Sequence, residues 1–333
     1  MTTVRLAGSV QDVVGTLRGW LEGPDDVRLV VETSGSTGAP KRVLLSRSAV
    51  EASAAATARR LGATGQWALV LPPSYVAGVQ VVCRSLLAGH PPTSGWPDDR
   101  DRAWFTSLVP TQLHRLLDSP DDLAALRTAH TVLLGGGPID PALRARAEAE
   151  GVRVVATYGS AETAGGCVYD GHPLDGVAVA VGTEGRVRIS GPTLFDGYEG
   201  DPELTAECLV DGWFLTSDAG RLDEDGRLTV LGRIDDMVVS GGVNVPAPAV
   251  AARLRRHPGL TDAEVLGVDD PEWGQRVVAF VVPASSGADL AELRDWVAEE
   301  HPRAWAPRQV VALPEIPRLG NGKPDRVALR GLA

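Results

Sequence analysis

The chain is poor in the features that secretion, membrane insertion or zinc binding would require. Its 333 residues contain only three cysteines, an odd number without a Cys-x-x-Cys pair, which argues against a disulfide framework or a zinc site and indicates a reducing compartment. No apolar run approaches the roughly 18 to 20 residues of a membrane-spanning helix. The N-terminus lacks the charged and long apolar stretches of a secretion signal. These absences predict a cytoplasmic protein that does not insert into membranes.

Basic side chains are outnumbered by acidic ones, with 32 Lys and Arg against 43 Asp and Glu. The formal net charge of −11 argues against a nucleic-acid partner, because nucleic-acid-binding proteins concentrate basic side chains. A smaller phosphate-bearing ligand is compatible with an acidic protein if local cations, oriented N–H groups and a divalent metal neutralise it. The candidate cations lie far apart in the sequence, at Lys41, Arg42, Arg233 and Lys323, and their convergence is a hypothesis.

Apolar runs alternate with amphipathic stretches over the first half of the chain. The stretches that predict helices are residues 10–22, 48–61, 78–88, 111–128 and 139–150. The runs that predict strands are residues 28–31, 42–46, 67–71, 104–109, 131–134 and 153–156. This alternation is typical of a mainly parallel sheet covered by helices on both faces. Ligands of such sheets bind beyond the carboxyl ends of the strands, where the glycine-bearing segments 135–138 and 158–160 fall.

A different pattern begins near residue 175. Short β-like pieces with Gly and Asp turns between them predict an antiparallel unit, and a mixed helix–strand unit follows to the C-terminus. The length suggests two domains. We expect an α/β protein whose large N-terminal domain, residues 1–232, has a mainly parallel sheet plus a β subdomain. A small mobile α+β C-terminal domain is expected over residues 233–333.

The most informative segment is T-S-G-S-T-G-A-P-K at residues 33–41. Glycines let backbone N–H groups approach a polyphosphate, hydroxyls add donors, and a lysine adds a point charge. The spacing is not that of a Walker A loop, because two residues separate Gly38 from Lys41 and a strand follows instead of a helix. Taken alone, the segment could equally be a polar turn between strands.

Four later segments fit the same chemistry. They are Y-G-S-A-E-T (158–163), W-F-L-T-S-D (213–218), G-R-I-D-D-M-V-V-S-G-G-V-N-V (232–245) and G-N-G-K-P-D-R (320–326). With the first loop, and in this order and spacing, they resemble the acyl-adenylate-forming (AMP-binding) superfamily of acyl-CoA ligases, luciferases and peptide-synthetase adenylation domains. The resemblance covers most of the chain, from residue 28 onward.

Three less specific segments narrow the resemblance. S-L-V-P-T-Q-L-H-R-L-L (107–117), L-L-G-G-G-P-I (133–139) and G-G-C-V-Y-D-G (165–171) are similar to the o-succinylbenzoate–CoA ligases of menaquinone biosynthesis. Most relatives carry a long segment before the phosphate loop, which begins near residue 33 here, so a compact form of such a ligase is expected.

The resemblance implies a reaction in two halves. A substrate carboxylate attacks the α-phosphate of ATP, giving acyl-AMP and pyrophosphate. The C-terminal domain then swings, and the thiol of coenzyme A displaces AMP to form a thioester. ATP, Mg²⁺ and coenzyme A are therefore the implied cofactors and a small carboxylic acid the implied substrate. Both halves require charge neutralisation at phosphate and placement of two nucleophiles in turn.

The resemblance assigns the phosphate and metal roles to three places. The loop would bind the β- and γ-phosphates through Ser34, Gly35, Ser36, Thr37, Gly38 and the catalytic Lys41. Glu162 would hold Mg²⁺, which prefers carboxylate and phosphate oxygens; a solvated surface glutamate is the alternative. Lys323 would contact the α-phosphate and the substrate carboxylate during adenylation, although a lysine near a chain end is often simply solvated.

The remaining assignments concern the nucleoside, the hinge and coenzyme A. Adenine would lie between Tyr158, with Gly159 beside it, and the backbone of residues 135–137, centred on Gly136, while a buried tyrosine could also be plain core. Asp218 and Arg233 would bind the ribose hydroxyls or phosphate, with a turn aspartate as the alternative. Asp235 matches the hinge position, which a simple Asp-Asp turn could also explain. The pantetheine channel would be lined by Gly241 and Gly242.

The chain departs from the family pattern at three positions. Arg42 replaces a glycine after the loop lysine, Ala161 replaces the Thr or Ser before the metal glutamate, and Tyr75 replaces a common histidine. Tyr75 and Arg84 are the candidate contacts to the acyl substrate, and an arginine with a structural role is the alternative for Arg84. Cys83 and Cys167 are interpreted as packed side chains, not nucleophiles.

Two rival functions stay open. Another aryl- or acyl-CoA ligase of the superfamily would carry the same motifs. A catalytically impaired, nucleotide-binding relative is suggested by Arg42 and Ala161. The presence of the charged motif residues argues against it; these are Glu162, Asp218, Arg233 and Lys323. A homo-oligomer is possible, and the sequence carries no signal for its size.

Overall fold

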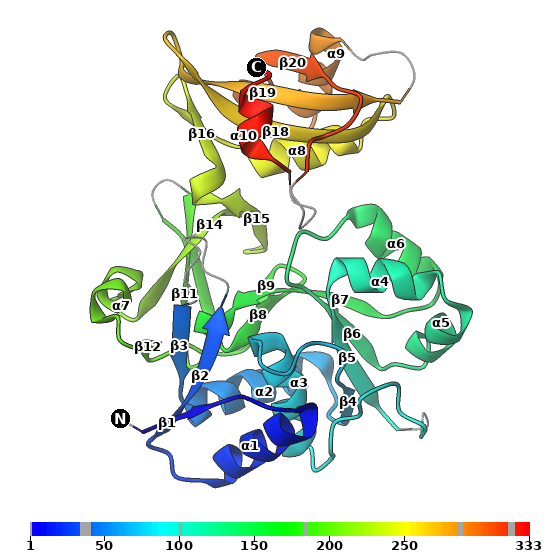
Figure 1. Cartoon of the computed structure of the whole chain (residues 1–333), viewed down its shortest axis with the longest axis vertical. Coiled ribbons are helices and arrows are strands. Elements are labelled where there is room, and N and C mark those ends of the chain that lie inside the picture. The colour runs from blue at the N-terminus through cyan, green and yellow to red at the C-terminus, as the bar shows by residue number, and fades with distance from the viewer. Residues whose placement is uncertain (1, 34–40, 100–101, 183–184, 285–288, 319–323) are drawn as a thin grey trace. The chain divides into compact units, whose positions relative to one another are not determined.

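The computed structural model describes residues 2–33, 41–99, 102–182, 185–284, 289–318 and 324–333 (Figure 1). The chain forms two compact units, which are described one at a time. Unit 1 comprises residues 1–180, 188–215 and 223–228, and unit 2 comprises residues 181–187, 216–222 and 229–333. The division into functional domains at residues 232/233 stays a prediction.

A four-stranded sheet in unit 1 carries the two ends of the hydroxyl-rich loop. Its order is β1 (Thr2–Arg5), β2 (Val27–Thr33), β3 (Lys41–Leu45) and β12 (Gly197–Tyr198). β1 and β2 are parallel, whereas β3 is antiparallel to both β2 and β12. The strand expected at 42–46 is thereby confirmed as β3.

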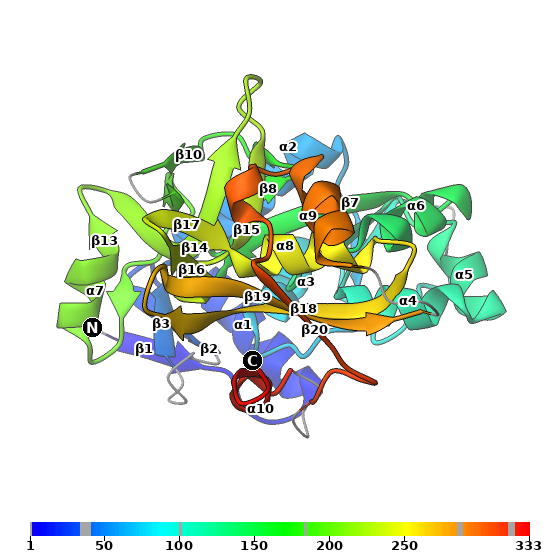
Figure 2. The same ribbon diagram turned by 90° about the horizontal axis from the view of Figure 1, so that it is seen from above.

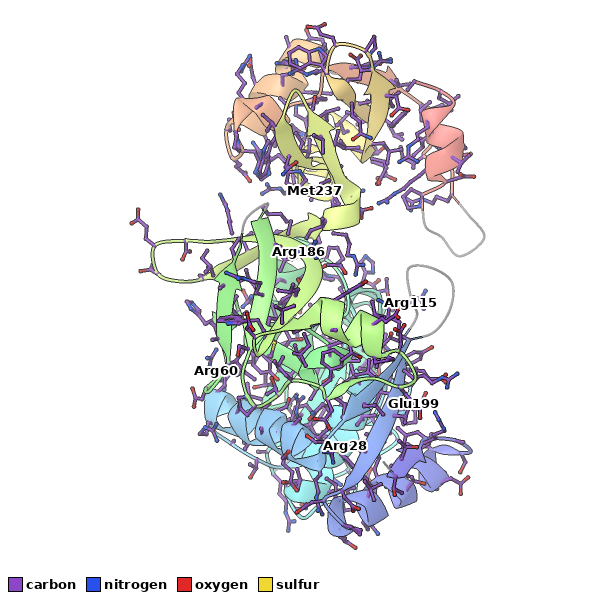
Figure 3. All side chains as sticks on the ribbon, turned by 90° about the vertical axis from the view of Figure 1, so that its left-hand side faces the viewer. Arg28, Arg60, Arg115, Arg186, Glu199 and Met237 are labelled. Carbon is purple, nitrogen blue, oxygen red and sulfur yellow. The ribbon has the colours of Figure 1, made fainter. Side chains whose placement is uncertain are left out.

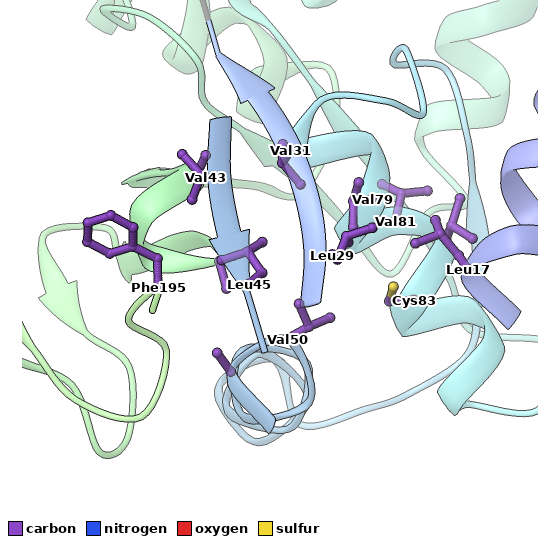
Figure 4. Packing of buried hydrophobic residues seen from close by; sticks show 14 of the residues in the cluster. Leu17, Leu29, Val31, Val43, Leu45, Val50, Val79, Val81, Cys83 and Phe195 are labelled. Atoms are coloured by element: carbon purple, nitrogen blue, oxygen red, sulfur yellow. The ribbon is translucent and has the colours of Figure 1, made fainter. Parts of the chain in front are cut away.

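Apolar side chains of this sheet pack against the neighbouring helices. Helix α1 (Val10–Glu22) begins at a capping box between Ser9 and Asp12 and buries Leu17. Leu29 of β2 and Leu45 of β3 are also fully buried, in one cluster with residues of α2 (Arg47–Leu61) and α3 (Val76–Leu87) (Figure 4). Removing this apolar surface from water, at roughly 25 cal/mol per Å², stabilises the packing of the sheet against the helices.

The larger sheet of unit 1 is parallel over its first four strands. Its order is β4 (Gln66–Ala68), β5 (Trp104–Leu108), β6 (Thr131–Leu134), β7 (Val154–Ser160), β8 (Gly165–Tyr169) and β9 (His172–Pro173). β4 to β7 pair in parallel, and β7–β8 and β8–β9 pair antiparallel. The expected mainly parallel sheet with helices around it is confirmed.

Alternating side chains explain why helices cover both faces of this sheet. Trp67, Phe105 and Leu133 pack into the cluster that contains α2 and α3. Their neighbours, which point the other way along a strand, pack with α4 (Pro110–Leu117), α5 (Pro120–Leu126) and α6 (Pro141–Ala149). Figure 1 shows α4, α5 and α6 grouped together beside β5, β6 and β7.

One expected helix is in fact two. The stretch 111–128 divides into α4 and α5, with Pro120 at the first position of α5. Proline has no N–H to donate and clashes with the preceding turn, so it begins a helix instead of continuing one. The prediction of one helix over 111–128 was wrong for this reason.

A further sheet follows in the sequence. Its order is β10 (Ala178–Val181), β11 (Arg186–Ser190), β14 (Trp213–Leu222) and β13 (Leu209–Val210), with β15 (Leu228–Arg233) also paired to β14. Helix α7 (Pro202–Cys208) precedes β13. These strands correspond to the β-like pieces expected after residue 175.

Unit 2 ends in an α+β fold, as expected. Its sheet has the order β17 (Val243–Pro246), β16 (Met237–Ser240), β19 (Gly274–Pro283) and β18 (Leu260–Asp270), with β20 (Gln309–Ala312) parallel to β19. Helices α8 (Ala247–Arg255) and α9 (Leu290–Ala298) share one apolar cluster with this sheet, and α10 (Arg326–Arg330) shares another. Figure 2 shows α8 next to β18 and β19. No helix in the described ranges has the length and apolarity needed to cross a membrane.

Candidate active site

The ends of the hydroxyl-rich loop lie opposite each other in unit 1. Thr33, the last residue of β2, pairs with Lys41, the first of β3, in antiparallel register. The loop therefore connects two hairpin strands and does not lead into a helix, which separates it from a Walker A loop. Ser34, Gly35, Ser36, Thr37 and Gly38 lie outside the described residues, so their roles stay predictions.

Lys41 lies over an aromatic ring that the sequence analysis did not single out. Its Nζ is 5.4 Å from the centroid of the Tyr198 ring, within the range at which an ammonium is attracted to the face of an aromatic ring. Tyr198 is in β12, directly beside β3, and pairs with Val43. The lysine that would bind phosphate is therefore placed by two neighbouring strands.

Glu162 is buried, not solvated. It lies in a 3₁₀ turn (Ala161–Thr163) after β7 and is only 8% exposed. The backbone N–H of Phe195 donates to its carbonyl oxygen over 2.9 Å. The Tyr198 hydroxyl donates to Glu162 Oε1 over 2.8 Å. Burial, and then the negative charge of Glu162, raise the pKa of Tyr198 far above its usual range, so this hydroxyl keeps its proton.

The groups around Glu162 suit a divalent cation that takes some of its ligands from the protein and others from phosphate. Ser160 Oγ, two residues away, is buried without a hydrogen-bond partner in the described structure. Among the described residues there is no cluster of three or more His, Cys, Asp or Glu side chains that could hold a metal by themselves. One carboxylate and a nearby hydroxyl suit Mg²⁺, which keeps most of its coordination for water and substrate phosphate.

Glycines allow close backbone approaches where β6 ends and where the last residues of β7 pair with β8. A Cβ on Gly135 would lie 2.4 Å from Thr157 Oγ1, and one on Gly159 would lie 2.2 Å from the Gly165 carbonyl oxygen. Gly136 has a φ of +78°, which favours glycine. Tyr158, half-buried in β7, is next to Gly159. This is the place at which the fold class predicts a ligand.

Asp218 and Arg233 come together within unit 2. They lie on the paired strands β14 and β15, and Arg233 Nε is 4.0 Å from Asp218 Oδ1. The Asp218 N–H donates to Thr216 Oγ1 over 3.1 Å, and that hydroxyl donates to the Val187 carbonyl over 2.9 Å. Both charged side chains are partly exposed, 23% for Asp218 and 45% for Arg233, so a ligand can reach them.

The expected hinge and pantetheine residues also lie in unit 2. The backbone of Asp235 is in a 3₁₀ turn (Ile234–Asp236), and the next residue, Asp236, forms an ion pair with Arg326. Gly241 and Gly242 form the turn between β16 and β17 with φ values of +59° and +78°. A Cβ on Gly241 would lie 2.6 Å from the Trp273 ring. Lys323 lies outside the described residues.

Arg42 is held by a carboxylate. Its Nη1 donates to Glu199 over 3.2 Å, and Arg5 donates to the same carboxylate over 2.7 Å (Figure 3 labels Glu199). The hydrogen bond from Arg5 lowers the pKa of Glu199; desolvation opposes this shift and the hydrogen bond from Arg42 adds to it. The additional positive charge at position 42 is therefore partly neutralised on the strand that carries Lys41.

The two candidate substrate residues differ in their environment. Tyr75 precedes α3 and is 53% exposed. Arg84 is only 7% exposed, lies 5.1 Å over the Trp67 ring and donates weakly to the Tyr169 hydroxyl at 3.4 Å. These contacts favour the structural interpretation of Arg84.

The cysteines are packed as expected. Cys83 and Cys167 are fully buried, and burial raises the pKa of each thiol to about 12. A thiol with so high a pKa is a poor nucleophile at neutral pH.

Comparison with known proteins identifies the family. Residues 19–199 match the AMP-binding enzyme family, and residues 249–323 match the AMP-binding enzyme C-terminal domain. The chain is 42% identical to a probable 2-succinylbenzoate–CoA ligase of Mycobacterium tuberculosis, over 96% of this chain and 88% of that protein. It is 33% identical to the 2-succinylbenzoate–CoA ligase of Geobacillus kaustophilus, over 92% of this chain and 70% of that protein.

Solved structures agree with the sequence relatives. The o-succinylbenzoate CoA synthetase of Bacillus subtilis, in complex with its acyl-adenylate intermediate, superimposes with a TM-score of 0.74 at 26% identity. That match covers 91% of this chain and 68% of the other. ATP-bound MatB from Rhodopseudomonas palustris gives a TM-score of 0.76 at 26% identity, over 93% of this chain and 68% of the other. The expected superfamily is confirmed: this chain belongs to the family of AMP-binding enzymes.

Proposed function

We propose that this protein is an ATP-dependent 2-succinylbenzoate–CoA ligase. The observation that carries the proposal is the 42% identity to a probable ligase of that kind over 96% of the chain. The buried Glu162 and the Asp218–Arg233 pair support it, because they supply the charges that adenylate formation requires.

In the first half-reaction, a carboxylate oxygen of the acid attacks the α-phosphorus of ATP. The bond from that phosphorus to the bridging oxygen of pyrophosphate breaks, which leaves acyl-AMP. Lys41 and the loop before it neutralise the β- and γ-phosphates, and Lys323 neutralises charge at the α-phosphate. Glu162 would hold Mg²⁺, which supplies further charge neutralisation when bound.

The nucleoside is bound by the glycine-lined loops and the ribose pair. Gly136 and Tyr158 flank adenine, since a small backbone on one side and a flat ring on the other leave room for a base. Asp218 accepts hydrogen bonds from the ribose hydroxyls, and Arg233 donates to oxygen atoms of the ribose or phosphate.

In the second half-reaction, the sulfur of coenzyme A attacks the acyl carbon, and AMP leaves with the electrons of the broken carbon–oxygen bond. Gly241 and Gly242 leave space for the pantetheine arm in the β16–β17 turn. Asp235 is the proposed hinge between functional domains at 1–232 and 233–333, which lets one active site serve both halves.

The acyl substrate has one specific rival. A feruloyl-CoA synthase from Amycolatopsis is also 33% identical to the chain, over 90% of it and 69% of that protein. Both acids are aryl compounds, and they differ in that 2-succinylbenzoate has a second carboxylate. Tyr75 is the better-placed candidate to contact the acid, because it is exposed whereas Arg84 is in the core.

A panel of acids tests the proposal. The purified protein is incubated with ATP, Mg²⁺, coenzyme A and one acid at a time, with pyrophosphate release measured and products identified by mass spectrometry. We expect 2-succinylbenzoate to give the highest kcat/KM and a succinylbenzoyl-CoA product. A higher kcat/KM for ferulate would show that ferulate is the better substrate. If no acid gave AMP, the result would favour the interpretation of the protein as a catalytically impaired relative.

A further inference from the structure

Tyr198 touches both charged residues that the function requires in unit 1. Its hydroxyl donates to Glu162 Oε1 over 2.8 Å in a buried hydrogen bond. Its ring face lies under the Lys41 ammonium, with 5.4 Å from Nζ to the ring centroid. The charge-assisted hydrogen bond restricts where the Glu162 carboxylate points, and the cation–π attraction favours a Lys41 ammonium held over the ring.

The segment around Tyr198 holds Glu162 at two points. The Phe195 N–H donates to the Glu162 carbonyl over 2.9 Å, while Tyr198 holds the carboxylate. Tyr198 itself is fixed, because its N–H donates to Thr205 Oγ1 over 2.8 Å and its ring meets Phe195 edge to face at 5.0 Å. The side chain is 6% exposed, which leaves it little rotamer freedom.

The hydrogen bond occupies only one carboxylate oxygen. Within the described part of the chain, Oε1 of Glu162 accepts from Tyr198, and no hydrogen bond reaches Oε2. Outer hydrogen bonds of this kind orient metal-binding carboxylates, and their loss typically costs 10–100-fold in metal affinity.

From these contacts we propose that Tyr198 is a positioning residue for the phosphate and metal end of the site. Its hydroxyl orients the Glu162 carboxylate so that Oε2 faces the cation, and its ring holds the Lys41 ammonium in position to bind the phosphates. The proposal rests on the metal and phosphate roles given above to Glu162 and Lys41, and it is independent of which acid is the substrate. A purely structural tyrosine, filling space beside Phe195, is the alternative.

Metal binding separates the two interpretations without any turnover. Mn²⁺ serves as the probe, with free Mn²⁺ counted by electron paramagnetic resonance in the presence of α,β-methylene-ATP. Tyr198→Phe removes the hydroxyl and keeps the ring. Tyr169→Phe is the matched control, because its hydroxyl is also buried and lies 2.9 Å from Thr57 Oγ1.

We expect Tyr198→Phe to raise the Kd of Mn²⁺ about tenfold, the lower end of the usual effect of losing such a bond. Tyr169→Phe is expected to change the Kd of Mn²⁺ less than about twofold, because its hydroxyl contacts Thr57 and Arg84, neither of which is proposed to bind the metal or the phosphates. Equal Kd values for Tyr198→Phe and the wild type would overturn the proposal. The proposal would also be overturned if the wild-type protein bound no Mn²⁺ in the presence of the nucleotide. The acid panel described above tests the proposed function separately.

A double-mutant cycle confirms the route of the effect. If Tyr198 acts through Glu162, Tyr198→Phe changes the Mn²⁺ affinity of the wild type but not that of a Glu162→Gln variant. An undiminished effect in the Glu162→Gln background would show that the hydroxyl acts elsewhere and would overturn the proposal.

The second role, toward Lys41, has its own readout. Lys41 and Lys323 are the only lysines of the chain, so peptide mass spectrometry resolves their reaction rates with an amine-reactive ester. Tyr198→Leu, which removes the ring, is expected to speed labelling of Lys41 severalfold relative to Lys323, and Tyr198→Phe to leave that ratio unchanged. An unchanged ratio in Tyr198→Leu would contradict this second role, and this measurement remains informative even if Tyr198→Phe folds poorly.

Discussion

Asp218 and Arg233 face each other from the paired strands β14 and β15, with 4.0 Å between a carboxylate oxygen and the guanidinium Nε. Thr216 fixes the Asp218 backbone through a 3.1 Å hydrogen bond. Such a pair can present an acceptor and a donor to neighbouring hydroxyls of one sugar. The arrangement leads to the first prediction.

Asp218→Ala should weaken ATP binding by roughly 10–100-fold, because a hydrogen bond to a charged group contributes about 1.5–3 kcal/mol. The wild type should bind 2′,3′-dideoxy-ATP more weakly than ATP, and the variant should not distinguish the two nucleotides. Calorimetry with both nucleotides measures this. Glu224→Ala, at an exposed turn position, is the control, and preserved discrimination in Asp218→Ala would remove Asp218 from the ribose site.

Lys323→Ala should abolish acyl-AMP formation and leave thioester formation from supplied acyl-AMP largely intact. Its ammonium is needed only where charge develops at the α-phosphate. Of the 32 Lys and Arg residues only Lys41 and Lys323 are lysines, and we expect Lys323→Arg to fail as well, because a planar guanidinium does not replace a compact ammonium. Single-turnover assays of each half-reaction decide; equal loss in both would contradict the assignment.

Gly159→Ala should destabilise unit 1 and weaken nucleotide binding. The added Cβ would lie 2.2 Å from the Gly165 carbonyl oxygen, and relieving such overpacking costs about 1–3 kcal/mol. Urea unfolding and ATP titration measure both effects. Gly95→Ala, elsewhere in unit 1, would have no neighbouring atom within 4 Å of its Cβ and should behave as the wild type. Similar behaviour of the two variants would show that the close approach at Gly159 is unimportant.

His301 should make the stability of unit 2 depend on pH. Burial lowers its pKa from 6.5, Glu300 opposes this effect, and Arg221 and Arg253 add to it. Because the unfolded state then binds the proton more readily, the free energy of unfolding falls as the pH drops below about 6.5 and stops falling below the folded-state pKa. His301→Gln should therefore show a shallower loss of stability between pH 7 and pH 5 in urea titrations. An identical slope for variant and wild type would refute this.

Much of the architecture could be predicted from local patterns. Continuous apolar strands such as 131–134 and amphipathic stretches such as 10–22 specify their own secondary structure, because burial rewards one periodicity over another. The structure places these elements at Thr131–Leu134 and Val10–Glu22. The prediction of a single helix over 111–128 was wrong because Pro120 begins a new helix, and a proline is a local signal that the sequence does display.

The motif residues were recognisable because phosphate and metal chemistry restricts which residue types can serve. Glycines, hydroxyls, one carboxylate and a lysine at a family-like spacing indicated Lys41, Glu162, Asp218 and Lys323 from the sequence alone. The burial of Glu162 and of Arg84 was not readable in this way, since exposure depends on what packs against a side chain from elsewhere in the chain.

The sequence by itself therefore determined the family, the chemistry and the residue types that carry it, because each of these depends on short segments whose local order is sufficient. Only the tertiary structure decided that Tyr198 joins Glu162 to Lys41. Tyr198 is 36 residues from Glu162, and it lies beside the strand that carries Lys41 because β12 pairs with β3. Strand pairing between distant segments is a property of the whole fold, and no spacing rule along the chain encodes it.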